Sequence, residues 1–66
     1  MKLRVNGQEK EISAGKSLAA FLEESGYKKE RIAVERNGRI APKSSYGTTV
    51  LQDGDVLEVV SFVGGG

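Results

Sequence analysis

Two Asn-Gly dipeptides, at positions 6–7 and 37–38, constrain the fold of this chain more than any other feature. Each dipeptide lies between short segments in which apolar and polar residues alternate. Asn-Gly in that setting is the strongest short-range signal for a two-residue hairpin turn, because both residues tolerate a positive φ. The sequence therefore predicts two β-hairpins, over residues 1–12 and 31–42.

The alternation also predicts which hairpin side chains face a core, since successive residues of a strand point to opposite faces of a sheet. In the first hairpin the expected inward residues are Leu3, Val5 and Ile12. In the second hairpin Ile32 and Val34 alternate with their neighbours, and the short return strand ends before a proline. Each hairpin thus presents an apolar face that another element must cover.

Residues 18–25, between the two hairpins, predict one short helix. Ser17 is a suitable N-cap, and Gly26 is a suitable C-terminal stop. The residues that recur at helical spacing are Leu18, Phe21, Leu22 and Ser25. Because this stripe is narrow, the helix must lie on a sheet.

A last strand, "DVLEVVSFV", follows an Asp-Gly-Asp turn at residues 53–55. One helix on one face of a sheet of short strands gives an α+β two-layer fold. This order of elements resembles the ubiquitin-like β-grasp fold. The resemblance implies a mixed sheet of four to five strands, in which the last strand lies centrally, beside the first and parallel to it. We expect residues 1–63 to form this domain and residues 64–66 to form a flexible glycine tail.

The 66 residues include no Cys and no His. This excludes thiol nucleophiles, imidazole bases and metal sites built on those side chains, so we expect no metal site and no enzyme active site. Ten Lys and Arg against nine Asp and Glu give a net charge of +1, too weak a field to predict binding to nucleic acid or to a membrane. No segment approaches the ~18 apolar residues of a membrane span, and we expect a cytoplasmic protein.

Two groups of charged residues have competing interpretations. Asp53 and Asp55 are candidate ligands for a cation, but an isolated Asp-Gly-Asp lacks the further ligands of a calcium loop and is better explained as a structural turn. Arg36 and Arg39 flank the second Asn-Gly turn. They would form an anion or partner patch, or they are simply charged turn flanks, which are common at sheet edges.

The last strand carries the candidate docking surface. Period-2 alternation places Leu57, Val59, Ser61 and Val63 on one face and Val56, Glu58, Val60 and Phe62 on the other. Glu58 marks the second set as the open face, because an unpaired carboxylate under a helix is costly. Val60 and Phe62 are then apolar groups that face solvent, as at a docking surface.

Three glycines follow this strand directly. Glycine runs are common as flexible tails, and that interpretation stays open. Glycines also thread narrow channels, and three of them extend on the order of 10 Å, enough to carry a carboxylate into a partner's active site. On this second interpretation the carboxyl group of Gly66 is the reacting group.

The segments "VERNGRI" at 34–40 and "LQDGDVLEVVSFVGGG" at 51–66 resemble the ThiS family, the sulfur carriers of thiamin biosynthesis. The resemblance implies that a ubiquitin-activating-like adenylyltransferase, using ATP and Mg, adenylates the carboxylate of Gly66. A sulfur donor protein then forms a thiocarboxylate, and thiazole synthase takes the sulfur; the chain itself holds no cofactor. The partner-binding residues would be Glu58, Val60, Phe62, Val63, Gly64 and Gly65.

Two alternatives remain at this point. The small subunit of molybdopterin synthase is also a β-grasp carrier that ends in Gly-Gly. The chain would otherwise be a β-grasp interaction module that is never modified. An unmodified module tolerates an addition at its C-terminus, whereas a carrier does not.

Overall fold

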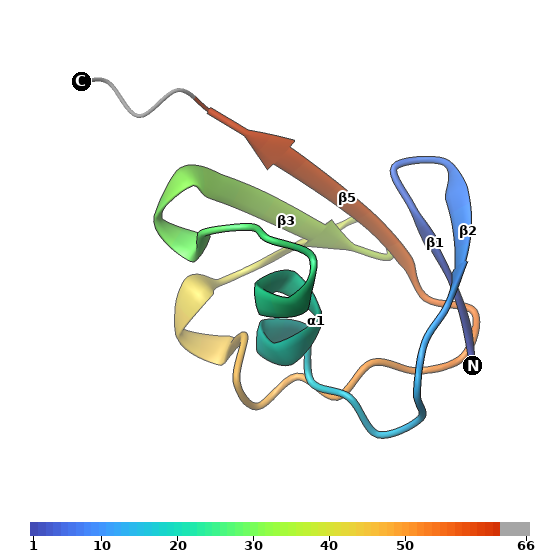
Figure 1. The fold of residues 1–66 in the computed structure, drawn as a ribbon. Coiled ribbons are helices and arrows are strands. Elements are labelled where there is room, and N and C mark those ends of the chain that lie inside the picture. The colour runs from blue at the N-terminus through green and yellow to red at the C-terminus, as the bar shows by residue number, and fades with distance from the viewer. Residues whose placement is uncertain (63–66) are drawn as a thin grey trace.

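The computed structural model describes residues 1–62, which form one sheet and one helix (Figure 1). The elements are β1 (Lys2–Val5), β2 (Gln8–Glu11), α1 (Leu18–Glu24), β3 (Ile32–Arg36), β4 (Arg39–Ala41) and β5 (Val56–Ser61), with 3-10 turns at Lys29–Arg31 and Lys43–Ser45. The five strands lie in the order β2-β1-β5-β3-β4, and α1 packs on one face. This confirms the expected β-grasp fold. The proposed tail, at residues 64–66, lies outside the described residues.

The last strand is central, as expected. β5 pairs with β1 in parallel, with Arg4 opposite Val56, and with β3 in antiparallel fashion. A parallel pair needs a long crossover, and here the helix and the second hairpin provide it. The strand nearest the C-terminus is therefore held on both edges by distant parts of the chain.

Both Asn-Gly dipeptides form the predicted turns. The φ angles are 50° and 81° at Asn6 and Gly7, and 54° and 82° at Asn37 and Gly38. Two consecutive positive φ values define the type I′ turn, whose twist matches that of the flanking strands. The two hairpins therefore have nearly the same local geometry.

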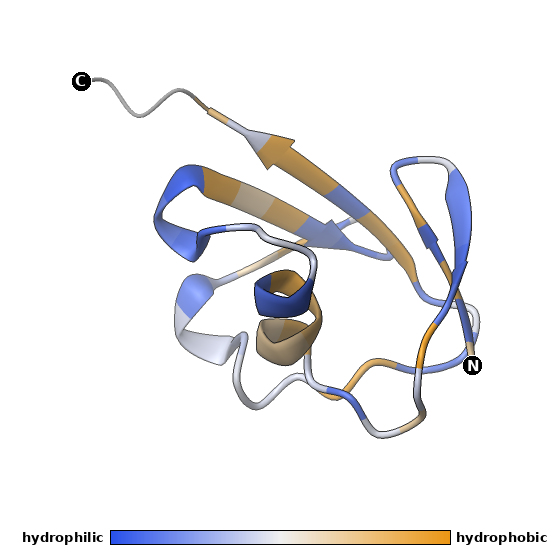
Figure 2. Ribbon diagram, in the orientation of Figure 1, coloured by the Kyte–Doolittle hydropathy of each residue, from blue (hydrophilic) through white to orange (hydrophobic). Residues whose placement is uncertain are grey.

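The helix has the predicted caps and buried residues. The Ala20 N–H donates to the Ser17 Oγ at 3.1 Å, and Gly26 follows the helix with a φ of 85°. Leu18, Phe21 and Leu22 are buried, whereas Ser25 is the exposed C-cap. The apolar stripe faces the sheet, where Figure 2 shows hydrophobic residues along β3 and β5.

The core draws on more of the chain than the periodic segments. Most of its side chains come from the elements predicted to face inward, and Ile12 packs against it half-buried. Tyr46 and Leu51, from the irregular connection before β5, are also buried. This connection is tied to the start of the helix, because the Leu18 N–H donates to Thr49 O at 2.8 Å. The core residues are Leu3, Val5, Leu18, Phe21, Leu22, Ile32, Val34, Tyr46, Leu51, Leu57 and Val59.

The Asp-Gly-Asp segment is a structural turn, as predicted. The Lys2 N–H donates to Asp53 Oδ1 at 2.7 Å, which ties the turn to β1. Asp55 is only 5% exposed, and its carboxylate accepts hydrogen bonds from Arg36 Nε at 2.8 Å and from the Gln52 N–H at 2.8 Å. No group of three or more potential metal ligands occurs in residues 1–62.

The two arginines that flank the second turn lie in different environments. Arg36 forms an ion pair with Asp55, so its charge is neutralised within the domain. Arg39 is exposed. The structural interpretation of this pair is therefore correct for Arg36. Over the same range of the chain, no helix is long and apolar enough to cross a membrane.

Candidate functional site

The two faces of β5 differ sharply in burial. Leu57 and Val59 are buried beneath the helix, whereas Glu58, Val60 and Phe62 are exposed. This agrees with the face assignment made from the sequence. Val56, predicted for the open face, is also exposed, at 39%.

An apolar surface lies on the open side of the sheet, and we call it the open-face patch. Its most exposed side chain is Ile40 of β4, at 72%, compared with 61% for Val60 and 46% for Phe62. Ile40 and Val60 line the same shallow hollow with Glu35. Ile40 was not predicted as a docking residue from the sequence. Its position in the short return strand of the second hairpin was the signal that could have identified it. The patch consists of Ile40, Val56, Val60 and Phe62.

Two carboxylates lie beside the apolar side chains of the open-face patch. Glu35 of β3 is directly opposite Glu58 of β5, and both are exposed. Like charges directly opposite each other on neighbouring strands are destabilising. Neither side chain forms an ion pair within residues 1–62. Apolar side chains beside two unpaired carboxylates are complementary to a partner surface that is apolar and bears a basic side chain.

Phe62 is held at the end of the strand by a lysine. The Lys43 Nζ lies 5.7 Å from the centroid of the Phe62 ring and also donates to the carbonyl oxygen of Ile32. A cation at this distance is attracted by the face of the ring. The Phe62 N–H donates to Arg31 O at 2.9 Å, so its backbone is fixed as well. Backbone hydrogen bonding on the β3 side therefore extends one residue past β5, to Phe62.

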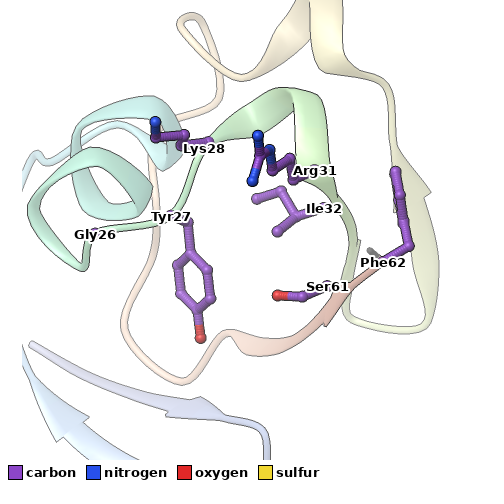
Figure 3. A pocket seen from close by; sticks show the side chains of 7 residues that line it. All are labelled: Gly26, Tyr27, Lys28, Arg31, Ile32, Ser61 and Phe62. Carbon is purple, nitrogen blue, oxygen red and sulfur yellow. The ribbon is translucent and has the colours of Figure 1, made fainter. Parts of the chain in front are cut away.

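A groove opens on the helix side of the sheet, beside the end of β5 (Figure 3). Its volume is about 460 Å³. Ser61 was expected on the covered face, but it is exposed because the strand continues past the end of α1 and leaves this groove. Figure 3 shows the side chains of Tyr27, Arg31 and Ser61 around the opening. The β5-end groove is lined by Gly26, Tyr27, Lys28, Arg31, Ile32, Ser61 and Phe62.

The ionisable groups with shifted pKa values, Asp55 and Tyr46, are buried groups of the folded domain. Burial opposes ionisation of Asp55, but hydrogen bonds from Asn37 and Gln52 and the charge of Arg36 outweigh it, so the pKa of Asp55 is lowered. Burial raises the pKa of Tyr46. Neither group lies in the open-face patch or the β5-end groove. The predicted site residues Val63, Gly64, Gly65 and Gly66 lie outside the described residues.

Comparison with known proteins decides the family. The model of the ThiS family matches residues 3–66, almost the whole chain. The chain belongs to the ThiS family. The crystal structure of a thiamine biosynthesis protein (ThiS) from Geobacter metallireducens has the same fold, with a TM-score of 0.85, 29% sequence identity and full coverage of both chains.

Two further relatives are much longer proteins. The chain is 50% identical over 66 residues to a thiazole synthase from Paramagnetospirillum magneticum and 42% identical to one from Magnetococcus marinus. It spans 20% of the length of each. A third relative, an uncharacterized protein ycf40 from Pyropia yezoensis, is 36% identical and is covered over 93% of its length. A ThiS-like segment therefore occurs both within long proteins and as most of a short one.

Proposed function

We propose that this ThiS-family chain is a sulfur carrier of thiamin biosynthesis and that its reacting group is the carboxylate of Gly66. The observation that carries the proposal is the family match, which extends through the glycines to residue 66. A second support is the absence of Cys from the sequence, because sulfur carried without a thiol needs a carboxyl carbon. On this proposal the chain is a protein cosubstrate and not an enzyme.

The proposed chemistry has three steps. A carboxylate is a poor electrophile, so an adenylyltransferase first joins an oxygen of the Gly66 carboxylate to the α-phosphorus of ATP and releases pyrophosphate, with Mg on the nucleotide. The terminal sulfur of a persulfide on a donor protein then attacks the carbonyl carbon and displaces AMP. A thiol cleaves the resulting acyl disulfide, which leaves a thiocarboxylate on the chain and a disulfide on the donor. A thiazole synthase finally takes that sulfur into the thiazole ring. ATP and Mg belong to the activating enzyme, and the chain itself needs no cofactor.

The proposed docking surface is the open-face patch together with Glu58. Val60 and Phe62 offer exposed apolar area directly before the segment that carries the reacting group. Apolar anchors at the centre of an interface typically supply most of its binding energy. Val63 would follow Phe62 at the partner's surface, and Gly64 and Gly65 would enter the partner, since glycine lacks the Cβ that a narrow channel excludes.

Intact mass spectrometry tests the proposed reacting group. The chain is incubated with the cognate adenylyltransferase, ATP, Mg and a sulfur source, and the expected product is heavier by the difference between sulfur and oxygen. Removing Gly66 withdraws the carboxylate by ~3.5 Å, and a misplacement of ~1 Å already costs about a hundredfold in rate. Deletion of Gly66, or addition of one residue after it, should therefore abolish the mass gain. The control Glu23→Lys, on an exposed helix position, should load normally. A mass gain on the truncated or extended chain would exclude the terminal carboxylate.

A pair of matched variants tests the docking surface. Phe62 and Val50 are almost equally exposed, at 46% and 47%, but Val50 lies outside the open-face patch. Phe62→Asp should weaken binding to the adenylyltransferase by about 2 kcal/mol or more, whereas Val50→Asp should leave it unchanged. Thermal melts of both variants check the fold. Equal binding by the two variants would place the docking surface elsewhere.

A further inference from the structure

The β5-end groove combines three features at the point where β5 leaves the covered part of the sheet. It has an apolar floor at Ile32, which is buried, and a wall formed by the half-buried Tyr27. It borders the end of the strand at Ser61. It opens on the helix side of the sheet and shares only Phe62 with the open-face patch (Figure 3).

One edge of β5 becomes free at this groove. In an antiparallel pair, hydrogen-bonded and non-hydrogen-bonded positions alternate. The Phe62 N–H donates to Arg31 O, so Phe62 is a bonded position. Ser61, which is opposite Ile32, is then a non-bonded position. The Ser61 N–H and C=O therefore point away from β3, toward the edge that β1 covers only as far as Leu57.

The free edge of β5 begins just beyond Val59, the last residue that the Asn6 side chain binds. The Asn6 Nδ2 donates to Val59 O at 3.1 Å, and the Val59 N–H donates to Asn6 Oδ1 at 2.7 Å. Two residues further on, the Ser61 N–H and C=O have no backbone partner within residues 1–62. A strand edge of this kind accepts an extended peptide by main-chain hydrogen bonds.

The charged residues that line the β5-end groove have one sign. Lys28 and Arg31 line the groove, and neither forms an ion pair in the part of the chain that the structure describes. Lys43 adds a third cation beside Phe62. Unpaired cations around a small apolar floor suit carboxylates on the bound segment, and complementary charge favours both specificity and the rate of association.

We propose that the β5-end groove is a second docking site, which receives an extended acidic segment of the thiazole synthase. The main chain of that segment would pair with the Ser61 N–H and C=O, and its carboxylates would contact Lys28 and Arg31. The proposal rests on the proposed function. Two relatives named thiazole synthase contain a ThiS-like segment, which supports that enzyme as the partner. Gly66 is five residues beyond Ser61, so at ~3.3 to 3.6 Å per residue the protein that holds this groove is within reach of the reacting carboxylate.

Charge reversal tests the ionic part of the site. Binding of the full chain to the cognate thiazole synthase is measured by calorimetry for Lys28→Glu and Arg31→Glu. Each should weaken binding at least tenfold. The matched control is Lys10→Glu, an exposed position on β2 with the same change in charge, and it should bind within twofold of the unaltered chain. The proposal is overturned if the groove variants bind as tightly as the control.

Two substitutions at one residue test the main-chain part. Ser61→Pro removes the N–H that faces the free edge, which a strand tolerates because this donor pairs with no neighbouring strand. Ser61→Ala keeps the N–H. We expect at least tenfold weaker binding for Ser61→Pro and unchanged binding for Ser61→Ala, with thermal melts as the check on folding. Equal binding by the two variants would exclude main-chain pairing at this edge.

The result is independent of the sulfur chemistry. Binding to the synthase is measured without ATP or a sulfur source, so a chain that never gains sulfur contradicts the proposed function but leaves this measurement intact. Conversely, Arg31→Glu should still gain sulfur at saturating adenylyltransferase. If Arg31→Glu fails to load but binds the synthase normally, the groove serves a different partner and the proposal is wrong.

Discussion

The two Asn-Gly turns share a sequence and a backbone geometry, but their asparagines make different contacts with β5. At the first turn, the Asn6 N–H donates to Leu57 O at 2.9 Å. Both polar atoms of the Asn6 side chain then bond to the backbone of Val59. The side chain thereby replaces the next residue that β1 would have contributed to the ladder.

The second turn contacts the opposite edge and the beginning of the same strand. The Asn37 N–H donates to Val56 O at 2.8 Å, and the Val56 N–H donates to Asn37 Oδ1 at 2.8 Å. The remaining donor differs from that of the first turn, because Asn37 Nδ2 donates to the carboxylate of Asp55 at 3.0 Å. That carboxylate also binds Arg36.

The comparison shows that one dipeptide can close two turns and still occupy two electrostatic environments. Asn6 exchanges hydrogen bonds only with neutral backbone groups, whereas Asn37 belongs to a charged network around the buried Asp55. Hydrogen bonds to charged groups contribute about 1.5–3 kcal/mol, compared with about 0.5–1.5 kcal/mol for neutral pairs. The second turn should therefore be the more sensitive to substitution and to pH.

The largest difference should come from replacing each asparagine by aspartate. Asn37→Asp places a second carboxylate against Asp55 and removes a donor, so we expect the free energy of unfolding to fall by about 3 kcal/mol. Asn6→Asp keeps the acceptor for Val59 and meets no carboxylate, and about 1 kcal/mol should be lost. Urea unfolding at neutral pH measures both. Equal losses would contradict the electrostatic difference between the turns.

Acid should act on the second turn and spare the first. The pKa of Asp55 is lower in the folded chain than its ordinary value, so the unfolded chain binds a proton first as the pH falls. The resulting stability is complete above the ordinary carboxyl range and is lost as the pH falls through the lowered pKa. Urea unfolding from neutral pH to about pH 2 should show this loss in the unaltered chain and in Asn6→Gly, but much less of it in Asp55→Asn. An undiminished acid response in Asp55→Asn would show that other carboxyl groups cause it.

The sequence was sufficient for the features that depend on local or periodic chemistry. Asn-Gly pairs fix the two turns, Ser17 and Gly26 bound the helix, and alternation places Leu57 inward and Phe62 outward. Each of these follows from a rule about neighbouring residues. The glycine end remains a prediction, since it lies outside the described residues.

The features that were missed depend on contacts between distant segments. Tyr46 and Leu51 are buried although their segment has no periodicity, because the 3-10 turn at Lys43–Ser45 and the irregular turns after it fold the segment back on the helix. The amides of Asn6 and Asn37 acquire β5 as a partner only when the sheet assembles. Ser61 lines a groove because the seven-residue helix ends before the strand does. Neighbouring residues in the sequence indicate neither the hydrogen-bond partners of the asparagine amides nor the point at which the helix stops covering β5.

Replacing each asparagine by glycine should isolate the side-chain contacts. Glycine accepts a positive φ without strain, so the turns are retained while the amides are removed. We expect a loss of about 2 kcal/mol for Asn37→Gly and about 1 kcal/mol for Asn6→Gly. Thermal and urea unfolding measure both. A larger loss at position 6 would show that the neutral clamp on Val59 matters more than the charged network.

The smallest effect, and the one that should be equal at the two turns, is expected at their glycines. Gly7 and Gly38 have φ values of 81° and 82°, and a Cβ added at either would meet nothing within 4 Å. The cost of alanine is then the backbone conformation alone, about 1 kcal/mol at each position. Gly47 is the control, because a Cβ there also meets nothing within 4 Å and its φ is not in the positive range, so Gly47→Ala should change stability by less than about 0.5 kcal/mol. Urea unfolding of the three variants decides the point. If Gly7→Ala and Gly38→Ala differ by as much as the two Asn→Gly variants do, the turns themselves differ in strain, and the contrast between the asparagines cannot be assigned to their side-chain partners.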